Sequence, residues 1–126
     1  MSSGLFYWGT GGIAALYTVY AGLRLYSLGG ADLVSAKDAK RMINSGEIGT
    51  VIDVRTEFEY RLGHYPRARS LPVGNITASR VKGLNRERGI LVYCNTGQRA
   101  RKASEMLREL GFKKVYYIDG TYNSLL

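Results

Sequence analysis

The residue best placed to do chemistry is Cys94, the single cysteine of this 126-residue chain. It follows residues 89–93, an apolar run that predicts a buried strand, and precedes a glycine-containing loop over 95–98. Backbone N–H groups of such a loop can turn inward to bind an anion. A helix is expected to begin at Arg99, and its dipole and this cation both favour a thiolate over a thiol. We therefore interpret Cys94 as a nucleophile, the alternative being an inert core cysteine.

Helices and buried strands alternate over the segment that must position Cys94. Thr56 and Glu59 have the spacing of a capping box and predict a short helical turn after Arg55. The alternation predicts an α/β domain over residues 35–126, with a mainly parallel sheet flanked by helices. Open α/β sheets bind ligands at the carboxyl ends of their strands, where Cys94 lies. Strands are expected at 50–54, 68–72, 89–93 and 115–118, and the longer helices at 35–44, 75–84 and 99–110.

The stretch from Cys94 to Arg99 resembles the active-site loop of single-domain rhodaneses, Cys-x-x-Gly-x-Arg. Other stretches resemble the motifs of this family in the same order, and together they cover about residues 33–121. They are Ile52-Asp53-Val54-Arg55-Thr56 with Glu59-Tyr60, Gly63-His64-Tyr65-Pro66 with Ala68, the helix and strand after the loop, and Ile118-Asp119-Gly120.

The resemblance implies a sulfurtransferase that needs no cofactor and no metal. Cys94 would take the outer sulfur of an anionic donor such as thiosulfate as a persulfide and pass it to a thiol or cyanide acceptor. Asp53 and Arg55, and also His64, are expected to support the loop and not to react. The substrate-binding residues implied are Asn95, Thr96, Gly97, Gln98 and Arg99.

Several features keep other functions open. Related phosphatase and arsenate-reductase domains have one more residue between cysteine and arginine, so a phosphatase-like hydrolase is disfavoured. Arg67, Ala100 and Thr121 depart from the family pattern, and little of the family's final segment follows before Leu126. Weak turnover is therefore expected. The alternative function is a non-catalytic interaction subunit of rhodanese fold in a larger membrane or coat assembly.

Residues 5–23 form an uncharged stretch that ends at Arg24. Nineteen residues in a helix can just cross a hydrocarbon core of roughly 30 Å, so we expect one transmembrane helix, as an anchor over residues 1–27. A cleaved signal peptide and a buried helix are the alternatives, disfavoured by the absence of N-terminal basic residues and of a polar face. Small residues at every fourth position predict a helix partner in the membrane. A flexible linker is expected over 28–34.

All 18 basic and 10 acidic side chains lie in residues 24–126, so the net charge of +8 belongs to that part alone. This charge favours anionic partners, whereas the mixing of acids and bases without a motif argues against nucleic acid. Basic residues after the apolar stretch place the C-terminal domain on the cytoplasmic side, or its equivalent in stroma or matrix. A single cysteine suits a reducing compartment.

Overall fold

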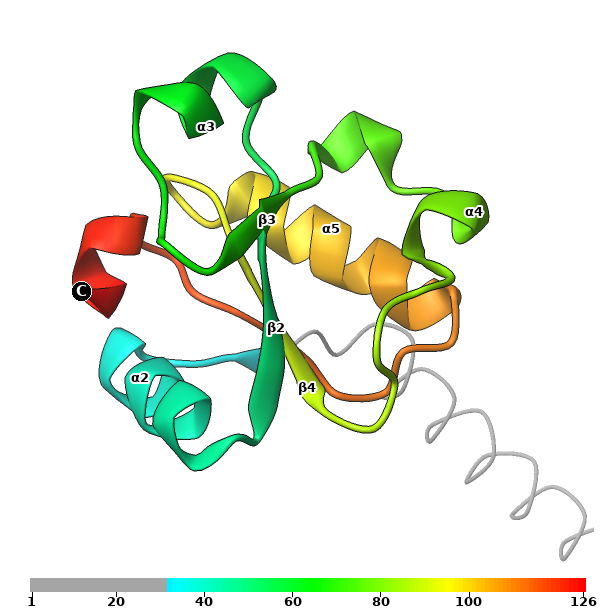
Figure 1. Cartoon of the computed structure of the whole chain (residues 1–126), viewed down its shortest axis with the longest axis horizontal. Helices are drawn as coiled ribbons and strands as arrows, with labels where there is room; N and C mark the ends of the chain where they lie inside the picture. Colours follow the sequence, from blue (N-terminus) through cyan, green and yellow to red (C-terminus); the bar gives the residue numbers. More distant parts are fainter. Residues whose placement is uncertain (1–31) are drawn as a thin grey trace, which may run out of the picture. The chain divides into compact units, whose positions relative to one another are not determined.

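A computed structural model describes residues 32–126, which form a five-stranded sheet in the order β1-β5-β4-β2-β3 (Figure 1). Every neighbouring pair of strands is parallel. All five residues of the central strand β4 are buried, as expected for a parallel sheet covered on both faces. The strands are β1 (Asp32–Leu33), β2 (Ile48–Asp53), β3 (Ala68–Ser70), β4 (Gly89–Tyr93) and β5 (Val115–Tyr117).

Helices cover both faces of this sheet, and Figure 1 shows α2 and α5 on opposite sides of it. Ala39 and Met42 of α2 pack with one set of buried strand residues, while Ala103 and Leu107 of α5 pack with the other set. The sheet is thus the middle of three layers. The helices are α2 (Ala36–Ser45), α3 (Glu57–Leu62), α4 (Ala78–Val81) and α5 (Gln98–Glu109), with 3-10 turns at Val73–Asn75 and Tyr122–Leu125.

Local chemistry explains where two of these helices begin and end. The Ser35 hydroxyl accepts a hydrogen bond from the backbone N–H of Asp38 at 3.0 Å, and α2 stops at Gly46, whose φ is +84°. Thr56 and Glu59 form the expected reciprocal capping box at the start of α3. The predicted short helical turn after Arg55 is confirmed.

The predicted helix over residues 75–84 is wrong in extent, because only Ala78–Val81 are α-helical. Thr77 occupies the N-cap position, with its hydroxyl accepting from the Arg80 N–H at 3.3 Å, so the helix cannot begin earlier. Val81 is its only buried residue, and one apolar contact does not sustain a longer helix.

The expected linker over 28–34 also differs from the structure at its end. Asp32 and Leu33 form β1, which pairs with Tyr116 and Tyr117 of β5. The rest of that linker and the proposed membrane anchor lie outside the described residues. Within residues 32–126, no helix is both long and apolar enough to cross a membrane.

Candidate functional site

Cys94 lies directly after β4, at the carboxyl edge of the sheet, and its side chain is 0% exposed. Its Sγ accepts hydrogen bonds from the backbone N–H of Gly97 at 3.2 Å and from that of Ala100 at 3.4 Å. Ala100 belongs to the first turn of α5, whose N-cap residue Gly97 provides no side-chain cap. The sulfur therefore accepts hydrogen bonds that a capping side chain would otherwise accept, and both donors favour negative charge on it.

The loop over Cys94 depends on the backbone conformation of Gly97. This residue has a φ of +91°, in the left-handed region that favours glycine. A Cβ atom at Gly97 would lie 2.8 Å from Cα of Asp119, the second residue after β5. Both the dihedral angle and the close approach require glycine, and the chain after β5 forms one wall of the loop.

A carboxylate from α3 holds the loop from outside. Glu59 accepts from Arg99 through both carboxylate oxygens, at 2.7 and 3.2 Å, and from the Asn95 amide at 2.9 Å. The hydrogen bond from Arg99 is the main reason that the pKa of Glu59 falls to about 2, and the same bond raises the pKa of Arg99. Glu59 thus links α3 to both ends of the loop.

This arrangement gives the predicted binding residues different surroundings. Asn95 and Arg99 are half-buried and directed to Glu59, whereas Thr96 and Gln98 are exposed. The sequence identifies Glu59 as a capping residue but does not reveal its contact with Arg99, 40 positions away. The same carboxylate caps α3 and contacts the loop, because Oε1 accepts from the Thr56 N–H as well as from Arg99.

Asp53 and Arg55 form a buried ion pair beside the site. Arg55 Nη2 lies 2.7 Å from Asp53 Oδ2 and also donates to the Gly63 carbonyl at 2.6 Å. The hydroxyl of Tyr93 donates to the same Asp53 oxygen at 2.7 Å and accepts from the Tyr65 N–H at 3.0 Å. Burial raises the pKa of Tyr93, and the hydrogen bond to Asp53 raises the pKa of Arg55. Tyr93 is a member of this network that the sequence did not indicate.

The side chain of His64 packs against Tyr60 of α3. Its ring stacks on the ring of Tyr60, with centroids 3.6 Å apart, and its Nδ1 lies 2.8 Å from the Tyr60 carbonyl oxygen. Among the described residues, no group of three or more His, Cys, Asp or Glu side chains could hold a metal ion.

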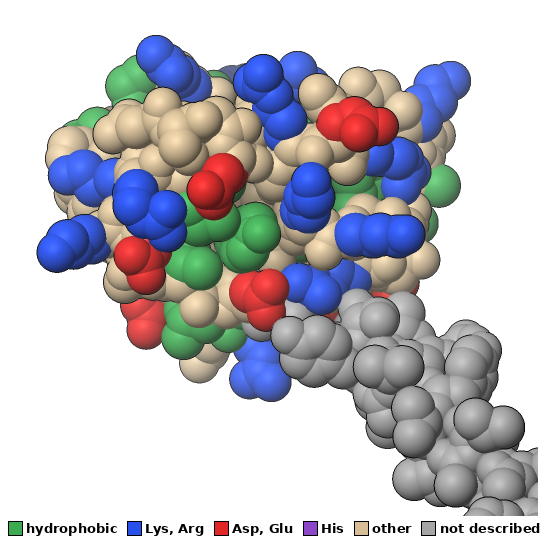
Figure 2. Space-filling model, turned by 90° about the horizontal axis from the view of Figure 1, so that it is seen from below, with side chains coloured by type: hydrophobic (Ala, Val, Ile, Leu, Met, Phe, Trp, Pro, Cys, Tyr) green, Lys and Arg blue, Asp and Glu red, His purple; other side chains and the backbone are tan. Residues whose placement is uncertain are grey.

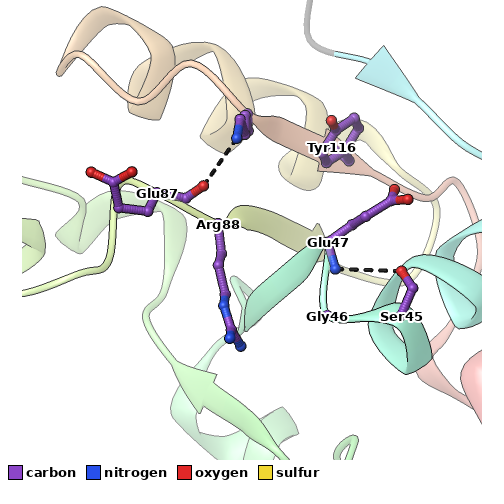
Figure 3. A pocket seen from close by; sticks show the side chains of 7 residues that line it. Ser45, Gly46, Glu47, Glu87, Arg88 and Tyr116 are labelled. Carbon is purple, nitrogen blue, oxygen red and sulfur yellow. Dashed lines mark hydrogen bonds between the residues drawn. The ribbon is translucent and has the colours of Figure 1, made fainter.

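A hollow of about 480 Å³ lies at the edge of the sheet opposite Cys94, where β2, β4 and β5 begin (Figure 3). Its walls carry mixed charges, with Glu47 and Glu87 against Arg88 and Lys114. Figure 3 shows the side chains of Glu87 and Arg88 pointing away from each other. Binding sites require convergent polar groups, so this hollow is not the candidate site.

Comparison with known proteins identifies relatives of this domain. The family model described as "Rhodanese-like domain" matches residues 35–126. A tRNA uridine(34) hydroxylase of Cronobacter sakazakii is 30% identical over 94 residues, and one of Buchnera aphidicola is 32% identical over 92 residues. These matches cover 71% and 69% of this chain but only 27% and 29% of the relatives.

Solved structures agree with the family match. The BH2092 protein from Bacillus halodurans is 28% identical, with a TM-score of 0.65 over 84% of this chain and 79% of that one. Human single-domain sulfurtransferase TSTD1 has a TM-score of 0.62, over 75% of this chain and 95% of its own. At 24% identity, that second likeness supports the fold alone.

Proposed function

The chain belongs to the rhodanese-like domain family, and we propose that it transfers sulfane sulfur through a persulfide on Cys94. The observation that supports this most is the pair of backbone N–H groups, from Gly97 and Ala100, that point at Sγ. Preorganised donors of this kind stabilise the charge of a thiolate. The relatives are named for tRNA hydroxylation, but this chain spans 27% of the Cronobacter protein, and we do not extend that activity to it.

The proposed reaction has two steps that balance without a redox partner. The Cys94 thiolate attacks the outer sulfur of thiosulfate, a new S–S bond forms, and sulfite leaves with the electron pair of the old bond. A thiolate or cyanide acceptor then attacks the terminal sulfur of the persulfide, which releases the Cys94 thiolate. The loop residues Asn95, Thr96, Gly97, Gln98 and Arg99 hold the anionic donor in this proposal, with Arg99 supplying the positive charge.

The burial of Cys94 adds a requirement to this reaction. Because the side chain is 0% exposed, a donor reaches Sγ only when the loop opens. Glu59 holds both Asn95 and Arg99, so the contacts of its carboxylate oppose that opening. We therefore propose that Arg99 leaves Glu59 to pair with the anionic donor, and that this change of partner opens the loop to the donor.

The test is an assay of thiocyanate formation from thiosulfate and cyanide by the full chain. Wild type is expected to turn over, Cys94→Ser to be inactive, and Arg101→Gln to keep the wild-type rate. Arg101 is a suitable control because it also lies in α5 but pairs with Glu105, away from the loop. Mass spectrometry should find about 32 Da added at Cys94 after thiosulfate treatment. Full activity of Cys94→Ser would refute the proposal.

A second candidate function is a non-catalytic interaction subunit in a larger membrane or coat assembly. The observation that favours it is the complete burial of Cys94, whose sulfur also serves as the cap of α5. This candidate predicts co-purification with partners in fixed ratio and no sulfur transfer by wild type. Measured turnover that depends on Cys94 would exclude it.

We also propose a membrane location, on the basis of the uncharged stretch over residues 5–23. The positive residues that follow it support an orientation with the C-terminal domain on the cytoplasmic side or its equivalent. The full chain should resist alkaline carbonate extraction from membranes, and the variant Ala15→Arg should be extracted. Extraction of the wild-type chain would contradict the proposal.

A further inference from the structure

The chain segment over residues 67–88, which includes β3 and α4, carries an excess of positive charge. Between residues 67 and 88, Glu87 is the only acidic residue. The basic residues of this segment are all exposed, namely Arg67, Arg69, Arg80, Lys82, Arg86 and Arg88. Figure 2 views the domain from below Figure 1 and therefore shows another face, on which Lys and Arg side chains also outnumber Asp and Glu.

Two of these arginines line one small hollow, which we call the β3–α4 hollow. It has a volume of about 170 Å³ and is separate from the Cys94 loop. Arg69 reaches it from β3 and Arg80 from α4. The other lining residues are Ile52, Ser70, Leu71 and Leu84.

The charges of Arg69 and Arg80 are not balanced within the domain. Other arginines, such as Arg55 and Arg99, form ion pairs with carboxylates. In the part of the chain that the structure describes, no ion pair includes Arg69 or Arg80. Two arginines thus line one hollow, and neither forms an ion pair with a carboxylate of the described residues.

We propose that the β3–α4 hollow binds a small oxyanion. Guanidinium groups present a planar pair of donors that matches phosphate, sulfate and carboxylate oxygens. The apolar side chains of Ile52, Leu71 and Leu84 lower the local dielectric, which strengthens the attraction between the arginines and an anion. The excess of surrounding positive charge also raises the local concentration of anions.

The volume of the hollow limits the ligand to a small group. Pockets for drug-sized ligands measure roughly 300–1,000 Å³, so a hollow of about 170 Å³ is too small to enclose a nucleotide. It suits inorganic phosphate or sulfate, or the acid group of a short aliphatic carboxylate whose carbons contact the leucines. The lining includes none of residues 94–99, so this site acts independently of the proposed sulfur chemistry.

The test is titration of the full chain with inorganic phosphate, and separately with propionate, followed by amide NMR shifts. We expect saturable shifts at residues 69–71 and 80–84 with at least one probe, and the probe that binds more tightly identifies the preferred acid group. Arg69→Gln and Arg80→Gln should each raise Kd about tenfold. Arg67→Gln and Lys82→Gln are matched controls of equal charge outside the hollow and should change Kd less than about twofold.

Three results would overturn this assignment. The first is shifts with neither probe at these residues, or shifts that do not saturate. The second is an equal effect of all four substitutions, which would indicate diffuse attraction by surface charge. The third is binding that disappears in Cys94→Ser, which would place the anion at the Cys94 loop. All substituted arginines and the lysine are exposed, so the variants are expected to keep the wild-type circular dichroism spectrum.

Discussion

The contact of Glu59 with the Cys94 loop leads to a specific prediction about stability. The substitution Glu59→Gln keeps a side-chain oxygen that can accept from the Thr56 N–H, so the capping box is preserved. It removes the negative charge that Arg99 contacts through both carboxylate oxygens. The variant therefore tests the contacts of the carboxylate with the loop, which are the ion pair with Arg99 and the hydrogen bond from Asn95.

The size of the effect is bounded by the pKa of Glu59, which falls from 4.5 to about 2, mainly through the hydrogen bond from Arg99 and also through those from Thr56. At about 1.4 kcal/mol per pKa unit, the full displacement corresponds to about 3 kcal/mol. Side-chain exposures of 26% for Glu59 and 36% for Arg99 allow solvent to screen the pair. We expect a loss of about 1–2 kcal/mol, between the values for exposed and buried pairs.

The sign of the pH dependence is also determined. Since the folded-state pKa is lowered, the pair stabilises the fold above pH 4.5 and loses this effect as the pH falls toward 2. Urea unfolding at pH 7 and at pH 3.5 should show a smaller difference between wild type and variant at the lower pH. Glu57→Gln is the matched control, because the pair of Glu57 with Arg61 is 3.6 Å apart and mostly exposed. Equal effects of the two substitutions at pH 7 would refute the reasoning.

Three other predictions concern the same region. Asp53→Asn leaves the buried Arg55 without its counter-charge and should cost about 3–5 kcal/mol in thermal unfolding, whereas a loss below about 1 kcal/mol would contradict the buried pair. Gly97→Ala should cost about 1–3 kcal/mol and abolish sulfur transfer, because the added Cβ would clash with the backbone of Asp119 and alanine disfavours the left-handed φ of this position. Gly111 also has a left-handed φ but faces the end of the flexible Arg86 side chain, so Gly111→Ala should retain sulfur transfer. Equal losses of transfer in the two variants would contradict the role of Asp119 as a wall of the loop. Iodoacetamide should alkylate Cys94 at least about a hundredfold more slowly in the folded chain than in urea, and similar rates would show that the sulfur is accessible.

Features encoded by neighbouring residues could be predicted from the sequence. The strand at Gly89–Tyr93 and the capping box of Thr56 and Glu59 agree with the structure, because each depends on residues within a few positions. The position of Cys94 at the end of its strand is confirmed for the same reason.

Features that depend on distant contacts could not be predicted in this way. The two residues of β1 have no strand pattern of their own and become a strand only by pairing with β5. The contact of Glu59 with Arg99 needs the packing of α3 beside the loop, which a single sequence does not reveal. The predicted helix over 75–84 is wrong in extent, because Thr77 caps the helix and Val81 is its only residue packed into the core.

The wall that Asp119 provides for Gly97 has a consequence for synthesis of the protein. A ribosome makes Cys94 before it makes β5 and Asp119, so the thiol leaves the exit tunnel while Asp119 is still inside the tunnel and cannot yet pack against Gly97. During that time the sulfur is an ordinary solvent-exposed thiol, open to oxidants and to other nascent chains. The mature protein shields its sulfur by itself, but the nascent chain depends on the reducing capacity of the compartment in which it is translated.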